Sequence, residues 1–172
     1  MLTGTYDRDM PSARDALATL AVGRLAGLDV VSGDLVAAAA DAVAEGLEPP
    51  SMTLLAGLTG RDTVPVAEAF GQVIAELGIE LPSDATAARW QLLSECLGEM
   101  VRGDVPLRAA SARFRTLDRL LGRPSALGDL RRWLAMHAEW IPSDRTPIGF
   151  CEDQVLEQAR TLLAGPWPPA AG

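Results

Sequence analysis

Few side chains in this 172-residue chain could perform acid–base, nucleophilic or metal chemistry. There is one histidine, His137, and there are two cysteines, Cys96 and Cys151, while lysine and asparagine are absent. Without lysine the chain can form neither a Schiff base nor a lysine-containing phosphate loop, and no nucleophile elbow occurs. A four-ligand zinc site would have to include carboxylates. We therefore predict no catalytic residue, no cofactor and no metal, and the sequence leans away from an enzyme.

Each of these few candidates also has a structural interpretation. Cys96 falls on the apolar side of a predicted helix, where a thiol behaves as a small hydrophobic group. Cys151 lies near a predicted helix start, but Glu152 and Asp153 follow it directly and oppose formation of a thiolate. His137 lies among apolar residues at helical spacing, so we interpret it as a packing residue, with acid–base or metal chemistry as the alternative.

Charge is distributed unevenly along the chain. Residues 1–101 contain five arginines and fifteen acidic residues, whereas residues 102–132 contain eight arginines and three acidic residues. Residues 133–172 add two arginines and five acidic residues, and the whole chain has a net charge of −8. A basic segment in an otherwise acidic chain indicates a binding surface.

Five arginines are candidates for this surface. Spacings of seven and four place Arg108, Arg115 and Arg119 on roughly one face of a helix, and Arg131 and Arg132 follow on the next predicted helix. Guanidinium groups suit bidentate contacts with carboxylates and phosphates. We predict that these arginines dock an acidic partner. The alternative is that they pair with the acidic part of the same chain or face solvent.

Other partner classes are less compatible with the sequence. The net charge of −8 repels a polyanion, so we do not expect nucleic acid as a partner. No apolar run approaches the roughly 20 residues that span a bilayer, and the start of the chain lacks the pattern of a secretory signal. We expect a cytoplasmic protein with no membrane partner. Its partner would be another protein or a second copy packed on the alanine-rich stretch 36–43.

Helix boundary signals occupy most of the chain. Serine, threonine or proline precedes the apolar-periodic stretches and glycine follows them, whereas no strand-like alternation is flanked by hairpin turns. Ser12, Ser32, Ser51, Thr63 and Ser125 are predicted N-caps. The sequence predicts an all-α fold of about eight helices, over residues 12–27, 32–46, 51–57, 63–78, 85–103, 106–122, 125–140 and 147–165.

The length favours a single compact domain over residues 1–165. The proline-rich tail, residues 166–172, cannot continue the last helix. Its Trp167 has two interpretations, since it either docks on the protein body or on a partner, or belongs to a frayed end.

A further set of residues resembles a known group of sequences: Leu54, Gly57-Leu58, residues 76–82, Ala88-Arg89-Trp90 and Val101-Arg102-Gly103. Over these positions the chain resembles uncharacterised all-helical proteins of high-GC actinobacteria. The absence of lysine and asparagine, whose codons are A-rich, agrees with such a genome. The resemblance implies a cytoplasmic location and brings no activity, cofactor or site residue with it.

Two classes of function follow from these observations. The first is a non-enzymatic interaction or regulatory protein that presents a helical, arginine-bearing surface to an acidic partner. The second is a helical domain that binds or converts a small molecule in a pocket near Trp90, Trp133 and His137. We favour the first, because the sequence offers charge segregation and few chemically reactive groups.

Overall fold

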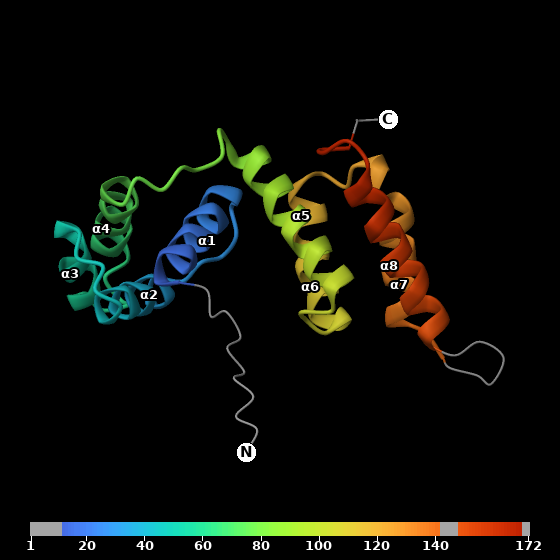
Figure 1. Cartoon of the computed structure of the whole chain (residues 1–172), viewed down its shortest axis with the longest axis horizontal. Helices are drawn as coiled ribbons and strands as arrows, with labels where there is room; N and C mark the ends of the chain where they lie inside the picture. Colours follow the sequence, from blue (N-terminus) through green and yellow to red (C-terminus); the bar gives the residue numbers. More distant parts are fainter. Residues whose placement is uncertain (1–11, 142–147, 170–172) are drawn as a thin grey trace, which may run out of the picture. The chain divides into compact units, whose positions relative to one another are not determined.

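The computed structural model describes residues 12–141 and 148–169, and these residues form eight α-helices and one 3₁₀ turn, with no strand among them (Figure 1). The predicted all-α fold class is confirmed. The chain divides into two compact units, residues 1–83 (unit 1) and residues 84–172 (unit 2). The single domain predicted over residues 1–165 stays a prediction.

Unit 1 contains four helices packed around one apolar core. Helix α2 contacts the other three, and α3 also packs against α4. The helices are α1 (Ala13–Ala26), α2 (Ser32–Ala44), α3 (Pro50–Gly57) and α4 (Thr63–Glu76). The core includes Leu17, Leu35, Ala39, Met52, Leu55, Val66, Phe70 and Val73. Removal of these side chains from water is the main stabilising contribution to the unit.

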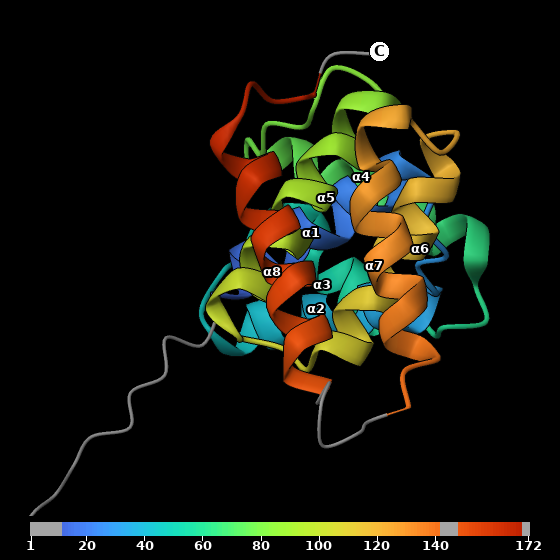
Figure 2. The same cartoon turned by 90° about the vertical axis from the view of Figure 1, so that its right-hand side faces the viewer.

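Unit 2 contains the other four helices and the 3₁₀ turn. Helix α5 packs against α6 and α8, and α7 packs against α8 and, more sparsely, against α6 (Figure 2). The elements are α5 (Ala85–Arg102), α6 (Leu107–Leu120), η1 (Ser125–Leu127), α7 (Gly128–Ala138) and α8 (Ile148–Ala164). The buried side chains include Leu92, Leu93, Leu97, Phe114, Leu117, Leu127, Leu130 and Val155.

Five helices end at glycines that the sequence predicts as helix ends. Positive φ angles occur at Gly27, Gly46, Gly78, Gly103 and Gly122, each just beyond the last residues of a helix. A residue with a Cβ is strained in this left-handed conformation, so glycine at these positions stops each helix at low cost. The predicted ends of five helices are therefore confirmed.

Ser12 caps α1 as predicted, since its Oγ accepts from the N–H of Asp15 at 3.2 Å. The other four predicted N-caps are wrong. Ser32 and Thr63 are the first helical residues and follow Val31 and Asp62, neither of which makes a side-chain capping bond. Ser51 lies inside α3, because Pro50 occupies the first turn, where its missing N–H costs nothing. Ser125 and the two residues after it form the 3₁₀ turn that leads into α7.

The hydroxyl of Ser51 is used in packing between helices instead of in capping. Its Oγ lies 3.0 Å from Oε1 of Gln72 and 2.8 Å from Oε1 of Glu76, and its N–H donates to Oε2 of Glu76 at 3.0 Å. Gln72 and Glu76 both belong to α4. These contacts join the start of α3 to the second half of α4.

The last helix begins at Ile148 and ends at Ala164. The predicted helix-breaking segment from Pro142 and the predicted start at Pro147 lie outside the described residues. Residues 166–169 are not helical. The indole Nε1 of Trp167 donates to the backbone oxygen of Trp90 at 3.3 Å, and the two rings meet edge to face with centroids 5.5 Å apart.

Candidate functional site

Helix α6 separates apolar from basic side chains. Phe114 and Leu117 are fully buried, whereas Arg108, Arg115 and Arg119 are exposed. This separation follows from the helical period, since residues three, four and seven apart share a face. Arg108, Arg115 and Arg119 thus share one exposed face of α6, which borders the buried Ser111 and lies away from Phe114 and Leu117.

A groove lies beside these arginines, between α6 and α7. One part has a volume of about 500 Å³ and the other about 360 Å³, and both are lined by Arg115, Leu134 and Ala138. We treat them as two ends of one α6–α7 groove. The larger, the Arg119 end, is also lined by Ala112, Phe114, Thr116, Asp118, Arg119, Arg123, Arg131, Ala135 and Glu139. The smaller, the Ser111 end, is also lined by Arg108, Ser111 and His137.

Arg131 is bound within unit 2. Its Nε and one terminal nitrogen donate to the two carboxylate oxygens of Asp118, both at 2.8 Å, and the same terminal nitrogen donates to the carbonyl of Pro124 at 3.0 Å. The Asp118 side chain is only 5% exposed. The hydrogen bonds that Arg131 donates to Asp118 raise the pKa of its guanidinium, although burial opposes this effect. Arg131 therefore ties α7 to α6 and neutralises a buried carboxylate.

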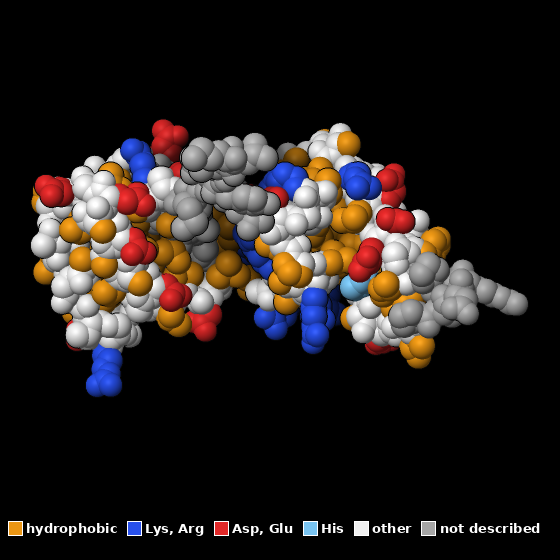
Figure 3. All heavy atoms as spheres, turned by 60° about the horizontal axis from the view of Figure 1, so that its bottom comes forward, with side chains coloured by type: hydrophobic (Ala, Val, Ile, Leu, Met, Phe, Trp, Pro, Cys, Tyr) orange, Lys and Arg blue, Asp and Glu red, His pale blue; other side chains and the backbone are white. Residues whose placement is uncertain are grey.

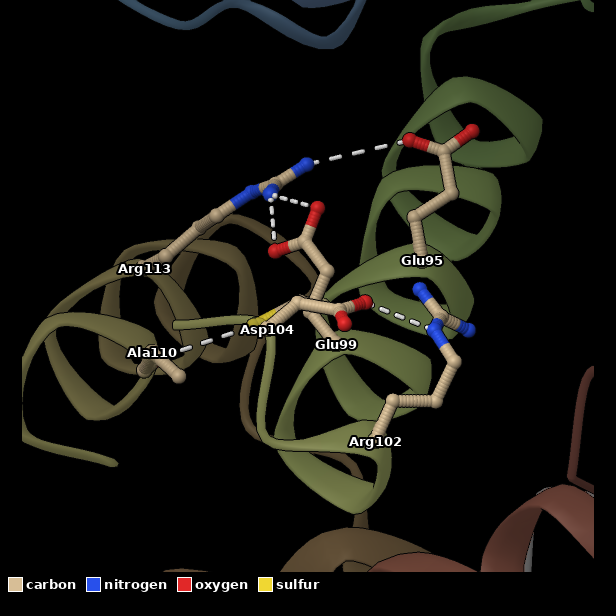
Figure 4. A network of polar contacts seen from close by, with 7 residues as sticks. Glu95, Glu99, Arg102, Asp104, Ala110 and Arg113 are labelled. Carbon is tan, nitrogen blue, oxygen red and sulfur yellow. Dashed lines mark hydrogen bonds and ion pairs between the residues drawn. The ribbon is translucent and has the colours of Figure 1, made fainter. Parts of the chain in front are cut away.

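Three more arginines of the basic segment pair with nearby acids. Arg113 donates to Glu99 of α5 at 2.8 and 3.0 Å and lies 3.7 Å from Glu95 (Figure 4). Two further pairs are exposed at the surface, one between Arg102 and Asp104 at 2.6 Å and one between Arg132 and Asp129 at 3.0 Å. Of these three, Arg113 pairs with residues of the acidic stretch 1–101, whereas the partners of Arg102 and Arg132 belong to the basic segment itself.

Four arginines remain along the groove: Arg108, Arg115, Arg119 and Arg123. All four are exposed, and none forms an ion pair with a residue in the described ranges 12–141 and 148–169. Figure 3 shows arginine side chains that project from the surface of unit 2 beside hydrophobic side chains. The groove therefore combines guanidinium groups along one edge with an apolar floor.

The structure places the residues of the second hypothesis in different surroundings. Trp90 packs on Trp167, and the Trp133 ring meets that of Phe150 with centroids 6.2 Å apart. His137 is half-buried and lines the Ser111 end of the groove, which neither tryptophan lines. A pocket shared by Trp90, Trp133 and His137 stays a prediction.

Both cysteines are buried, and neither forms a disulfide. Burial raises the pKa of the Cys96 thiol to about 11, against a smaller opposite effect of Arg113. Burial also raises the pKa of Cys151, and the nearby Glu152 adds to this effect. Because the thiolate is the nucleophilic form, neither cysteine is activated for attack near neutral pH.

Several residues of the groove could not be identified from the sequence. Leu134, Ala135 and Ala138 contribute the apolar floor from α7, and Ser111 contributes a buried hydroxyl from α6. Nothing in the sequence says which helix lies against the arginine face. Arg123 did carry a signal, because it continues the four-residue spacing of Arg115 and Arg119 after the turn at Gly122.

The described residues contain no group of three or more histidine, cysteine or acidic side chains placed to hold a metal ion. None of the helices in the same part of the chain is long and apolar enough to cross a membrane. The resemblance to helical proteins of actinobacteria stays a prediction. No protein-family model, no curated protein and no solved structure matches this chain.

Proposed function

We propose that this chain is a non-enzymatic cytoplasmic interaction protein that docks an acidic segment of a protein partner in the α6–α7 groove. The observation that supports the proposal is a row of four exposed arginines, Arg108, Arg115, Arg119 and Arg123, which have no ion pair with a described residue and line an apolar-floored groove. Such a combination suits a partner segment that brings both carboxylates and apolar side chains.

The charge along the groove favours an acidic occupant over a basic or neutral one. Of the acidic groups that line the groove, Asp118 is already neutralised by Arg131, which leaves Glu139 as the uncompensated carboxylate. An acidic segment would gain guanidinium contacts along the α6 edge and would be steered towards it before contact. A basic segment would meet repulsion from four arginines.

The apolar floor supports specific docking in addition to electrostatic attraction. Leu134 is almost fully buried, while Ala135 and Ala138 are exposed in the groove. Small side chains at these two positions leave room for larger apolar groups of a partner. Burial of apolar groups contributes affinity that salt does not screen, whereas the arginines contribute association rate and orientation.

A second copy of the chain is a specific candidate for the acidic partner. A groove of about 600 Å³ between α1 and α2 is lined by five alanines of the two helices and by the acidic residues Asp34, Asp41 and Glu45. This surface overlaps the alanine-rich stretch for which the sequence predicts self-association. Sedimentation velocity over a range of concentrations tests this version, and a monomer at every concentration would exclude it.

The direct test of the proposed function is affinity capture with a matched charge control. The double variant Arg115→Glu and Arg119→Glu reverses two charges inside the groove. The control variant Arg61→Glu and Arg160→Glu makes the same change in net charge at two exposed arginines that do not line it. We expect the groove variant to lose its captured proteins while keeping wild-type helicity and unfolding temperature, and the control to retain them. Equal retention by both folded variants would contradict the proposal.

A further inference from the structure

The two ends of the α6–α7 groove differ in their polar chemistry. The Ser111 end is lined by Arg108, Arg115, Ser111 and His137, with no carboxylate among its lining residues. The Arg119 end, in contrast, includes Asp118 and Glu139. The Ser111 end is thus the part of the groove in which cationic groups have no acidic neighbour along the wall.

Ser111 supplies an independent indication of a ligand. The residue is 8% exposed, and its hydroxyl is the buried side-chain oxygen that has no hydrogen-bond partner within the described part of the chain. A buried hydroxyl without a partner loses its hydrogen bonds to water and gains none in return, so native proteins seldom leave one unsatisfied. Because Ser111 lines the groove, its hydroxyl is placed to donate a hydrogen bond to an acceptor that binds there.

The residues around Ser111 are arranged to hold an anion. Arg108 and Arg115 are three positions before and four positions after Ser111, so the three side chains lie along one face of α6. Arg108 and Ser111 belong to the first turns of this 14-residue helix, and its N-cap residue, Pro106, makes no side-chain capping bond. The positive end of the helix dipole therefore adds to the field of the two guanidinium groups.

His137 also lines the Ser111 end, but it has a partner of its own. Its Nε2 lies 3.4 Å from Oε1 of Glu152. The ring is therefore oriented by α8, and we assign it no contact with the anion. The two arginines and the serine hydroxyl form the complete donor set of the inference.

We propose that the Ser111 end of the groove binds a phosphoryl group carried on the acidic segment of the partner, with Arg108, Ser111 and Arg115 as donors. A carboxylate has two oxygens and is satisfied by one bidentate guanidinium, whereas a phosphoryl group has three terminal oxygens and close to two negative charges. Two guanidinium groups with a hydroxyl between them match the larger anion. This inference rests on the proposed function and names the chemistry that would regulate it.

The size and continuity of the groove favour a phosphoryl group attached to a longer chain over a free ion. A volume of about 360 Å³ exceeds what one phosphoryl group fills. The two ends share Arg115, Leu134 and Ala138, so a peptide bound at the Ser111 end can continue along the apolar floor past Arg119. Phosphorylation of the partner would then switch docking from weak to strong.

The test compares two short acidic peptides that differ only in whether their central serine is phosphorylated. Binding to the full chain is measured by isothermal titration calorimetry at physiological ionic strength. We expect the phosphorylated peptide to bind about tenfold more tightly or better, since charge-assisted hydrogen bonds are the strong ones. Ser111→Ala and Arg108→Gln should each remove most of this preference. Arg119→Gln should lower the affinity for both peptides by the same factor and leave the preference for the phosphorylated one intact.

A second measurement separates failure of this inference from failure of the proposed function. Titration with inorganic phosphate, followed through backbone amide shifts, should perturb Ser111 and its neighbours in the wild type but not in Ser111→Ala. Equal affinity for the two peptides would overturn the phosphoryl inference and leave the docking groove in place. Binding of neither peptide, with phosphate still perturbing Ser111, would overturn the proposed function. Tighter binding of a single-stranded oligonucleotide than of the phosphopeptide would overturn the proposal that the bound phosphoryl group is carried on a peptide.

Discussion

Arg131 and Arg132 are adjacent in the sequence, but their surroundings differ completely. Arg131 forms two hydrogen bonds with the buried carboxylate of Asp118 and one with a backbone carbonyl, whereas Arg132 forms one exposed pair with Asp129 on its own helix. An exposed pair of this kind contributes little to stability, because water and salt screen it. A buried carboxylate that loses its partner is costly. The same residue type therefore has a structural role at one position and none at the next.

This difference leads to a prediction for two matched substitutions. Arg131→Gln should lower the free energy of unfolding by about 2 kcal/mol, because Asp118 stays buried without its cation. This loss is smaller than that expected for a fully buried ion pair, since a third of the Arg131 side chain is exposed. Arg132→Gln should change it by less than about 0.5 kcal/mol. Urea unfolding of both variants measures the difference. Equal losses would mean that Asp118 does not depend on Arg131.

Cys96 gives a prediction for the dependence of stability on pH. Burial raises the pKa of this thiol to about 11, from an ordinary value of 9.0. Between these values the unfolded thiol ionises while the folded one stays protonated, so stability is complete below pH 9 and falls as the pH rises towards 11. The wild type should lose about 2 kcal/mol more than Cys96→Ala over this interval. Identical pH profiles of the two proteins in urea unfolding would contradict the raised pKa.

At the scale of the helix, α5 contains two glycines with different roles. Gly98 lies inside the helix, and a Cβ there would meet only the guanidinium end of Arg102, at 2.9 Å. That side chain is exposed and flexible, so it can move aside. Gly103 ends the helix with a φ of 73°, a conformation that an added Cβ disfavours. One glycine is thus replaceable and the other is required by the turn.

We expect opposite effects from substituting these two glycines. Gly98→Ala should stabilise unit 2 by about 0.5–1 kcal/mol, through lower backbone entropy of the unfolded chain and better helix propensity. Gly103→Ala should destabilise it by about 1 kcal/mol, because alanine is strained in the left-handed region. Thermal unfolding followed by circular dichroism distinguishes the two. A loss of stability in Gly98→Ala would show that Arg102 cannot move.

The ends of the helices were more predictable than their starts. A glycine followed by proline or a polar turn reports a local backbone requirement, which is why Gly103 and Gly122 were identified from the sequence alone. A serine near a helix start has several uses. Ser51 was predicted as an N-cap. Pro50 instead occupies the first turn of α3, and the Ser51 hydroxyl donates to Glu76 of α4. That choice depends on tertiary packing, which a local pattern does not contain.

The candidate site was predictable to a similar extent. Spacing alone identified Arg108, Arg115 and Arg119 as one face, because all three belong to the same helix. The role of Arg131 depends on Asp118, thirteen residues earlier, and on how α7 packs on α6. The apolar floor of the groove depends on the same packing. Local periodicity therefore predicted the edge of the site and not its floor.

At the scale of the molecule, the negative charge is concentrated in unit 1. Residues 1–83 contain four arginines and twelve acidic residues, whereas residues 84–172 contain eleven of each. Unit 1 therefore accounts for the whole net charge of −8. Repulsion among like charges destabilises a compact state and is screened by salt.

The two units lead to a prediction for separate fragments. Fragments 1–83 and 84–172 should each be helical and unfold cooperatively, because each contains its own buried core and the cut keeps Asp84, whose Oδ1 caps α5 at the N–H of Ala87. Added sodium chloride should raise the unfolding temperature of fragment 1–83 more than that of fragment 84–172. Circular dichroism at low and high salt measures both effects. Fragments that are unfolded alone would show that the two units form a single cooperative domain.

The edge-to-face contact of Trp167 with Trp90 has a spectroscopic consequence. All four tryptophans of the chain, Trp90, Trp133, Trp140 and Trp167, belong to residues 84–172. Intrinsic tryptophan emission therefore reports on unit 2 alone, and unit 1 contributes no indole signal. A change of emission wavelength on addition of a phosphopeptide would locate the event in the half of the chain that contains the groove, while far-ultraviolet dichroism follows both halves at once.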